Sequence, residues 1–517
     1  MADGSLDPAV AALLADPATY GLAPGTPVTR IDTHAAAVFL AGDRAFKVKR
    51  PVRYSYLDYG TLAAREAACR AELAVNAPFA ADLYLGVVPV TRQASGALAL
   101  GGAGEVVEWL VEMRRFDETT TLDHLAEAGE LPEPMIDALA ETVAAGHARM
   151  PAADASAWLQ ALARYAADDR ETFRTAPDLF PPDEAARLDT ATAAALHHNA
   201  GLILARGRLG LVRRCHGDLH LANVALVDGR PLPFDAIEFD PLIATGDVLY
   251  ELAFLLMDLV ARGRRRSACR LLNQYLLVAG RDGDLDALAA LPLFLSLRAQ
   301  IRAKVAVARR ALTSGAAASA AAHDAMRYFR LAVAALAPPP PHLFVVSGLS
   351  GTGKTSVARA IAGRLLPLPG ALVLRSDIER KRLHGVPATA RLPADAYQPE
   401  VTAQVYRRLV EQARRALEAG HSVVIDAVFA RPDERAALAA LGVACGVAVR
   451  GVWLEAPLDV RQARVSDRRG DASDADASVA AFQEDLEIGP LDWPRVDAAG
   501  PLEGVVLRAM SALGGPW

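Results

Sequence analysis

Asp218 and Asn223 stand five residues apart in a loop that opens with His216 and Gly217. A carboxylate at the first position can orient or accept a hydroxyl proton, and an amide oxygen one turn later can bind Mg²⁺. Downstream, two apolar runs flank Asp228-Gly229, which is a strong hairpin signal. This hairpin would return Asp235 beside Asn223, so we predict that Asn223 and Asp235 share a metal ion.

The lysine side chain that contacts phosphates at this first site should come from the predicted strand at 45–49. Lys47 and Lys49 lie on one face of that strand, so periodicity cannot choose between them, although Lys47 is the first choice. Glu72 on the following predicted helix is the expected partner, with Glu66 as the alternative. No G-x-G-x-x-G loop precedes the lysines, and the corresponding turn falls near residues 33–34.

A second phosphate-handling motif, G-x-x-x-x-G-K-T, occupies residues 348–355 between a predicted buried strand (343–347) and a predicted helix (356–365). Backbone N–H groups of such a loop cradle phosphates, its lysine contacts the β and γ phosphates, and its hydroxyl binds Mg²⁺. The predicted nucleotide-binding residues are Gly348, Ser350, Gly351, Thr352, Gly353, Lys354, Thr355 and Ser356, with Thr355 also a metal ligand.

Acidic residues follow two further predicted strands of this part. Asp377 comes after the strand at 372–374 and is a candidate base or a helix N-cap, and Asp426 ends the strand at 422–426 and is a candidate Mg²⁺ ligand. An arginine cluster at 461, 464, 468 and 469 is typical of a lid that neutralises the transferring phosphoryl group, with Arg464 and Arg468 as catalytic candidates. A solvated basic helix is the alternative.

The elements that must position these residues divide at a proline-rich stretch. We predict an N-terminal extension (1–30), a domain at 31–336, a stiff linker at 337–342 and a second domain at 343–517. A small β-rich lobe followed by a larger helical lobe gives the first domain an α+β, protein-kinase-like fold. The second domain should be α/β with a parallel sheet.

Two family resemblances rest on these motifs. The H-G-D-x-H-x-x-N run at 216–223 and the F-D-x-x-E-F-D run at 234–240 resemble the aminoglycoside phosphotransferase and choline kinase group, across roughly 30–335. The resemblance implies that Asp218 is the base, that Asn223 and Asp235 hold magnesium, and that residues 107–113, with Glu112 and Met113, form the hinge that receives the adenine. The second part resembles the gluconate kinase, zeta toxin and polynucleotide kinase group, and the whole resembles bacterial fusions of the two.

These resemblances imply a tandem kinase that uses ATP or GTP with Mg²⁺ to phosphorylate hydroxyls of small molecules of the sugar, amino sugar, aminoglycoside or nucleoside class. One alternative is a single active C-terminal kinase regulated by an N-terminal ligand-binding pseudokinase. Another is a zeta toxin-like kinase of nucleotide sugars.

The composition of the chain argues against several kinds of partner and site. The net charge of −6 argues against a nucleic-acid binder. Four cysteines without a CxxC pair argue against a zinc site or a disulfide framework and fit a cytoplasmic protein. The longest apolar run, near 252–260, is short for a membrane span and contains Asp258. The expected partners are therefore small-molecule hydroxyl acceptors, with neither nucleic acid nor a membrane expected and the oligomeric state left open.

Overall fold

The computed structural model describes residues 5–54, 57–281, 283–468 and 470–515. The chain forms two compact units: Met1–Glu171 with Ala200–Asp258, and Thr172–Asn199 with Leu259–Trp517. It passes from one unit to the other within α5 (Ala155–Thr175), α6 (Pro182–Arg208) and α7 (Val248–Ala261). The boundaries between the two compact units therefore do not fall at the proline-rich stretch. The predicted domain boundary at 337–342 stays a prediction.

The first unit opens with a six-stranded antiparallel sheet in the order β1-β2-β3-β8-β6-β7. Its strands are β1 (Val28–Asp32), β2 (Ala36–Ala41), β3 (Arg44–Lys49), β6 (Tyr84–Arg92), β7 (Leu98–Leu100) and β8 (Glu105–Arg114). Alternation along β3 sends Phe46 and Val48 to one face and leaves Lys47 and Lys49 on the other. β2 pairs with β3 in a hairpin that turns at Gly42-Asp43, and β3 confirms the predicted strand at 45–49.

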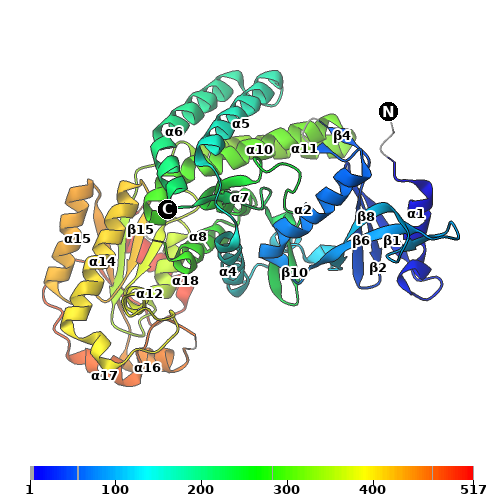
Figure 1. Ribbon diagram of the computed structural model, residues 1–517. Coiled ribbons are helices and arrows are strands. Elements are labelled where there is room, and N and C mark those ends of the chain that lie inside the picture. Colours follow the sequence, from blue (N-terminus) through cyan, green and yellow to red (C-terminus); the bar gives the residue numbers. More distant parts are fainter. Residues whose placement is uncertain (1–4, 55–56, 282, 469, 516–517) are drawn as a thin grey trace. The chain divides into compact units, whose positions relative to one another are not determined.

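Helices cover this sheet (Figure 1). From α1 (Pro8–Ala15), Val10 and Leu14 pack with Phe39 of β2, so the predicted N-terminal extension belongs to this core from its first described residues. The long helix α2 (Leu62–Ala80) separates β3 from β6 in the chain and packs against β8 through Cys69 and Val111. This arrangement confirms the predicted protein-kinase-like small lobe.

The lobe that holds this sheet also contains η1 (Pro17–Tyr20), β4 (Arg53–Tyr54) and β5 (Leu57–Asp58). A mostly helical part of the first unit follows. Besides α5, α6 and α7 it contains η2 (Glu118–Thr120), α3 (Leu122–Ala128), α4 (Glu133–Arg149), β9 (Val212–Arg214), η3 (Leu221–Asn223), β10 (Val224–Val227), β11 (Arg230–Pro233) and β12 (Thr245–Asp247). The strands β10 and β11 form the predicted hairpin, whose turn residue Asp228 has a φ of 50°.

The second unit contains a parallel sheet in the order β14-β15-β13-β16-β17. Its strands are β13 (Leu343–Gly348), β14 (Leu372–Arg375), β15 (Val423–Asp426), β16 (Val449–Glu455) and β17 (Arg495–Asp497). Every residue of β13 and β15 is buried, as expected for strands covered on both faces. The predicted strands at 343–347, 372–374 and 422–426 are confirmed.

The second unit also contains many helices. Two of them, α10 and α11, form a long antiparallel pair just before the proline-rich stretch. In full, the helical elements are α8 (Arg265–Ala279), α9 (Gly283–Asp286), η4 (Ala287–Ala290), α10 (Leu291–Ala311), α11 (Gly315–Ala335), α12 (Lys354–Ala362), α13 (Ser376–Leu383), η5 (Ala394–Tyr397), α14 (Pro399–Glu418), α15 (Pro432–Cys445), α16 (Leu458–Ser466), α17 (Ala477–Phe482), η6 (Gln483–Asp485) and α18 (Leu502–Leu513). Among the described residues, none of the helices combines the length and apolarity that a bilayer span requires.

The outer strand β14 of the parallel sheet is completed by a side chain of α8. The Asn273 amide donates to the Ala371 carbonyl oxygen (3.0 Å), and its oxygen accepts from the Val373 N–H (2.7 Å). These bonds satisfy edge groups that a neighbouring strand would otherwise pair. At Gly370 a Cβ would lie only 2.7 Å from the Cys269 sulfur, so helix and sheet edge pack closely here.

Replacing Asn273 should loosen this edge. We expect Asn273→Ala to leave the partly buried Val373 N–H without an acceptor, at a cost of up to about 1–3 kcal/mol. Amide hydrogen exchange at Val373 should accelerate accordingly. Gln274→Ala is the control, because adjacent helix residues face different directions. Unchanged exchange at Val373 in the Asn273 variant would show that α8 does not complete the edge.

Candidate functional site

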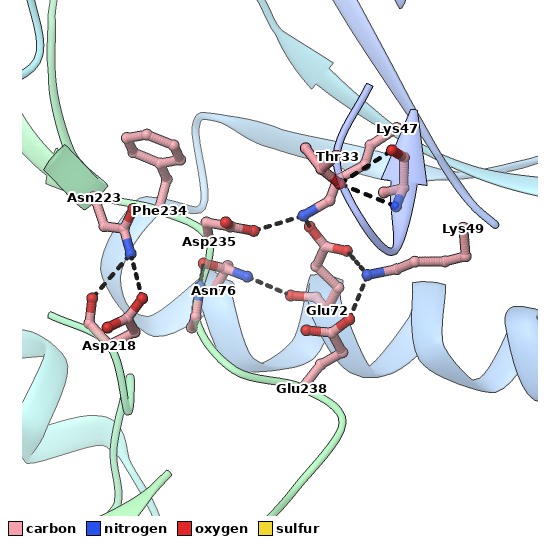
Figure 2. A network of polar contacts seen from close by, with 12 residues as sticks. Thr33, Lys47, Lys49, Glu72, Asn76, Asp218, Asn223, Phe234, Asp235 and Glu238 are labelled. Atoms are coloured by element: carbon pink, nitrogen blue, oxygen red, sulfur yellow. Dashed lines mark hydrogen bonds and ion pairs between the residues drawn. The ribbon is translucent and has the colours of Figure 1, made fainter. Parts of the chain in front are cut away.

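Two lysines and three carboxylates form an ion-pair network at the first site (Figure 2). Lys47 Nζ lies 2.8 Å from Glu72 Oε1 and 2.5 Å from Asp235 Oδ1. Lys49 Nζ lies 2.5 Å from Glu72 Oε2 and pairs with Glu238. Glu72 therefore bridges both lysines, and Lys47 is the one that reaches Asp235.

The charges in this network stabilise one another. Burial lowers the pKa of Lys47, but the carboxylates of Asp235, Glu72 and Glu238 outweigh burial and leave that pKa well above its ordinary value. The ammonium group of Lys47 in turn lowers the pKa of Asp235. Glu66, the alternative partner, instead accepts a hydrogen bond from Arg70 on its own helix.

The loop that carries Asp218 is held in place by its neighbours. Asn223 Nδ2 donates to the Asp218 carbonyl oxygen (2.9 Å) and to Asp218 Oδ2 (3.1 Å). His220 Nε2 lies 3.4 Å from the same carboxylate oxygen. The side chain of Asn223 therefore orients the carboxylate that the sequence assigns as the base.

Two buried acids on α7 brace the backbone of this loop. Glu251 Oε2 accepts from the Gly217 N–H (3.0 Å), and Asp258 Oδ2 accepts from the Leu221 N–H (3.1 Å). Sequence reasoning missed both roles. The available signal was Asp258 itself, a carboxylate inside an otherwise apolar helix, since buried acids require hydrogen-bond donors.

Asp235 is placed by the β10–β11 hairpin. The Phe234 N–H donates to the Asn223 carbonyl oxygen (2.9 Å), which brings Asp235 beside Asn223 as predicted. Asp235 has a φ of 62°, a conformation that non-glycine residues rarely adopt. Hydrogen bonds of its own N–H to Tyr84 Oη (2.9 Å) and of the Ala236 N–H to Asn76 Oδ1 (3.0 Å) hold this turn.

A cavity of about 390 Å³ opens between these charges and the sheet. Its lining includes both lysines and Asp235 together with the apolar side chains of Ile31, Val38, Met113 and Phe234. The turn at 33–35, which replaces a glycine-rich loop, also lines the cavity. A lining that is mostly apolar and carries a few charged groups is typical of a small-molecule or cofactor site.

The predicted hinge requires a correction. Residues 107–113 lie inside β8, a central strand paired with both β3 and β6, and the segment that follows the strand and lines the cavity is 115–116. The strand continues because both of its edges find partners. Met113 lines the cavity, whereas the Glu112 carboxylate accepts from Arg44 Nη1 (2.7 Å).

The short β4–β5 segment supplies a residue that the sequence did not indicate. Tyr59 Oη donates to Glu238 Oε1 (2.6 Å), and Lys49 Nζ lies 5.4 Å from the centre of the Tyr59 ring. Arg65 Nη1 donates to the Tyr59 carbonyl oxygen (3.0 Å) and fixes this segment. Tyr59 and Glu238 thus hold Lys49 in the network.

The donor set of the first site fits Mg²⁺. The carboxylates of Asp218, Asp235, Glu72 and Glu238 outnumber the two lysines, which leaves an excess of negative charge that a divalent cation would balance. Within the described ranges, no group of three or more His, Cys, Asp or Glu could hold a metal by itself. Asn223 and Asp235 would hold the ion, and phosphates and water would complete its shell.

At the second site, the loop at 348–355 is shaped by glycines with positive φ. A Cβ on Gly351 (φ 84°) would lie 2.5 Å from the Arg461 carbonyl oxygen, and one on Gly348 (φ 135°) would lie 2.5 Å from that of Leu454. Only glycine permits this close approach of backbones. The last glycine, Gly353, precedes α12, so the loop ends at a helix N-terminus that attracts phosphate.

The side chains of Lys354 and Thr355 are held by hydrogen bonds. Lys354 Nζ donates to the Leu349 carbonyl oxygen across the loop (3.0 Å), and burial lowers the pKa of Lys354. Thr355 Oγ1 donates to Asp426 Oδ2 (2.6 Å). A hydroxyl beside a carboxylate fits Mg²⁺, which keeps several of its own waters. The Ser350 N–H donates to the Gln483 side chain (2.7 Å).

Three loop positions, Thr352, Gly353 and Ser356, complete the predicted set. Thr352 Oγ1 donates to the Leu349 carbonyl oxygen (2.8 Å), which stabilises the turn. Ser356 lies in the first turn of α12. These contacts assign Thr352 to the shape of the loop and leave Gly353 and Ser356 at the helix N-terminus.

Asp377 lies in the first turn of α13, whose N-cap is Arg375. It is therefore not the cap that the alternative interpretation required. Burial raises the pKa of Asp377, and a carboxylate that holds its proton more readily is a better acceptor for a hydroxyl proton. The side chain of Arg375, which sequence reasoning passed over, donates from Nε to Asp426 Oδ2 (3.2 Å).

The arginine cluster does not share one helix face. Since α16 ends at Ser466, Arg468 lies beyond it, and Arg469 lies outside the described residues. Arg461 is buried, pairs with Glu484 and donates to the Ser350 carbonyl oxygen (3.4 Å), which braces the phosphate loop. Arg464 donates to the Ala499 carbonyl oxygen (3.2 Å).

Comparisons with known proteins cover both parts of the chain. A family model described as an AAA domain matches residues 343–487. Among solved structures, a gluconokinase from Sinorhizobium meliloti 1021 is 25% identical, covers 34% of this chain and 92% of its own, and has a TM-score of 0.24. A choline/ethanolamine kinase family protein from Mesorhizobium loti is 13% identical, covers 62% of this chain and 97% of its own, and has a TM-score of 0.32.

One comparison spans nearly the whole chain. The Mycobacterium tuberculosis protein named Uncharacterized protein Rv2004c (strain ATCC 25618 / H37Rv) is 32% identical over 491 residues, which is 92% of this chain and 94% of that protein. The sheet topologies described above and the family match at 343–487 confirm the predicted fold class of both parts. By this identity over almost its full length, the chain belongs to the family of the mycobacterial protein Rv2004c.

Proposed function

We propose that the chain is a tandem phosphotransferase, in which each site transfers the γ-phosphoryl group of ATP or GTP to a hydroxyl of a small molecule. One observation carries the proposal: each unit assembles the same three parts in one place. The first site combines Lys47, the Asn223–Asp235 pair and Asp218. The second combines Lys354, the Thr355–Asp426 pair and Asp377, whose charge acts with that of Asp426 to raise the pKa of Lys354 against burial.

The roles of these parts follow from phosphoryl-transfer chemistry. The acceptor oxygen forms a bond to the γ-phosphorus while the bond from that phosphorus to the bridging oxygen of the diphosphate breaks. The hydroxyl proton passes to Asp218 at the first site and to Asp377 at the second. Bound Mg²⁺ supplies charge neutralisation on the phosphates. The lysines hold the phosphates in line for the transfer.

The setting of the proposed enzyme is the cytoplasm, with small-molecule acceptors and with neither nucleic acid nor membrane as a partner. The net charge of −6 supports the exclusion of nucleic acid. Acceptors of the sugar, amino sugar, aminoglycoside and nucleoside classes are the starting panel for the first site.

One observation favours a regulatory role for the first unit. Its β1–β2 turn is closed by Thr33, whose N–H donates to the Ala36 carbonyl oxygen (2.8 Å), so the turn is shorter than a loop that covers phosphates. Against that role stands the complete set of Asp218, Asn223 and Asp235. Counting nucleotides distinguishes the two possibilities.

Equilibrium binding of a non-hydrolysable ATP analogue with Mg²⁺ tests the proposal. We expect two nucleotides per chain, one after Lys354→Ala, and only a partial loss of ATP turnover in either Lys354→Ala or Asp218→Ala. The control is Lys304→Ala, which removes a lysine of α10 outside both sites. A single nucleotide per wild-type chain, with all turnover abolished by Lys354→Ala, would refute the tandem reading.

A further inference from the structure

Three cations are buried on β14 and α13, next to Asp377 in the sequence. Arg375 at the end of β14 is 8% exposed, and Arg380 and Lys381 on α13 are 7% and 1% exposed. Arg380 donates to the Ala396 carbonyl oxygen (2.7 Å) and lies over the Tyr397 ring. A buried cation is costly unless an anion or several hydrogen-bond acceptors compensate it.

The anions that compensate Arg375 and Lys381 come from one acidic loop, residues 471–476. Asp471 Oδ1 lies 2.7 Å from Arg375 Nη2, and Asp474 Oδ2 lies 2.5 Å from Lys381 Nζ. Asp474 also accepts from Tyr397 Oη (2.5 Å) and from the Leu392 N–H (3.0 Å). Two carboxylates of this loop thus form ion pairs with buried cations.

The residue between those carboxylates faces the proposed base. The Ser473 side chain lowers the pKa of Asp377, against the larger effect of burial, and the Ser473 N–H donates to Asp471 Oδ1 (3.0 Å). The loop therefore presents a hydroxyl to Asp377 with an anionic group on each side. This is the arrangement that a phosphorylated alcohol would need to adopt, with its hydroxyl on the base and its charge on Arg375 and Lys381.

The use of lysine in the chain singles out Lys381. Of the 55 lysines and arginines, only Lys47, Lys49, Lys304, Lys354 and Lys381 are lysines. Three of these lie in the two nucleotide sites described above. A compositional preference for arginine acts along the whole chain, so lysine persists mainly where a compact, single-point cation is needed. Lys381 shares this pattern, which favours a ligand-binding role.

From these contacts we infer that the second site accepts an alcohol that carries an anionic group, a carboxylate or a phosphate, and that Lys381 and Arg375 bind this group. Asp471 and Asp474 of the acidic loop pair with the same cations. When the acceptor binds, its anionic group therefore replaces these carboxylates at Arg375 and Lys381. A neutral acceptor would separate Lys381 from its anion without replacing it, and a polycationic acceptor would be repelled. The inference rests on the proposed kinase function of the second site and excludes aminoglycosides there.

Binding of matched probes to the full-length chain tests the inference. With both nucleotide sites saturated by AMPPNP and Mg²⁺, the affinities of glycerol, glycerate and glycerol 3-phosphate are measured by calorimetry. Because hydrogen bonds to charged groups are worth about tenfold or more in affinity, we expect the two anionic probes to bind at least about tenfold tighter than glycerol. The two anionic arms separate a carboxylate from a phosphate.

Substitutions in the acidic loop and in its cation partners test whether these residues bind the anionic group. Lys381→Met should remove the preference for anionic probes, and Asp474→Asn should tighten their binding because the competing carboxylate is lost. Since Lys381→Met leaves Asp474 without its ammonium partner, Lys381→Met/Asp474→Asn removes both charges together and serves if the single variant fails to fold. Arg391→Gln is the matched control: Arg391 pairs with Asp476 of the same loop, but its side chain is 76% exposed.

Two results would overturn the inference: equal affinities for glycerol and both anionic probes in Asp474→Asn, or an anionic preference that survives in both Lys381 variants. Failure of the proposed function has a different signature. In that case AMPPNP binding itself would be unaffected by Lys354→Ala, whatever the probes do.

Discussion

Asp218→Asn is expected to lower phosphoryl transfer at the first site by about 10²–10⁴-fold while nucleotide affinity stays close to that of the wild type, because general-base catalysis contributes on this scale. The amide keeps the size of the carboxylate and can still accept the hydrogen bond from Asn223 Nδ2. It cannot take up the acceptor proton. The loop also keeps its anchors on Glu251 and Asp258.

The measurement is acceptor phosphorylation in a Lys354→Ala background, which isolates the first site. Asp228→Asn is the control: it makes the same chemical change in the β10–β11 turn, where the carboxylate pairs with Arg114 and is 70% exposed. If Asp218→Asn transfers phosphate at the rate of the Asp228 control, Asp218 is not the base.

Gly351→Ala should abolish nucleotide binding at the second site and leave the first site unaffected. The new Cβ would lie 2.5 Å from the Arg461 carbonyl oxygen at a φ of 84°, so the loop or α16 must move. Because Arg461 also donates to the Ser350 carbonyl oxygen, the movement would disturb the loop at two points. We expect a loss of roughly 3 kcal/mol or more, which is about a hundredfold in affinity.

Gly420→Ala separates this clash from ordinary backbone strain. Gly420 has a similar φ of 75°, but a Cβ there would meet no heavy atom within 4 Å. The Gly420→Ala substitution should therefore destabilise the chain slightly, and the variant should still bind two nucleotides. Titration of the ATP analogue against both variants makes the comparison, and two nucleotides bound by Gly351→Ala would show that the loop tolerates the displacement.

Local sequence signals predicted the elements and the order of the motifs well. The Asp228-Gly229 turn determined the β10–β11 hairpin and the return of Asp235 to Asn223, because turn chemistry and register are local properties. The apolar runs that became β13 and β15 were equally clear, since strands buried on both faces are apolar without interruption. The phosphate loop followed from its own motif.

Contacts between distant segments could not be predicted in this way. The lysines of β3 share Glu72, so the alternation that places both on one face could never select one of them. The family resemblance implied a hinge at residues 107–113, whereas pairing on both edges makes these residues part of β8, which extends to Arg114. Tyr59 and Glu251 act through partners 179 and 34 residues away, which no local pattern records.

The Asn273 contact with β14 bears on how such a fusion evolves. The outer strand of the parallel sheet takes two hydrogen bonds from a helix encoded about 100 residues upstream, ahead of the proline-rich stretch. A gene segment that began at that stretch would encode a sheet with an open, aggregation-prone edge. Recombination would therefore have to inherit α8 together with the phosphate-loop part, so the heritable module is longer than the motif-bearing segment.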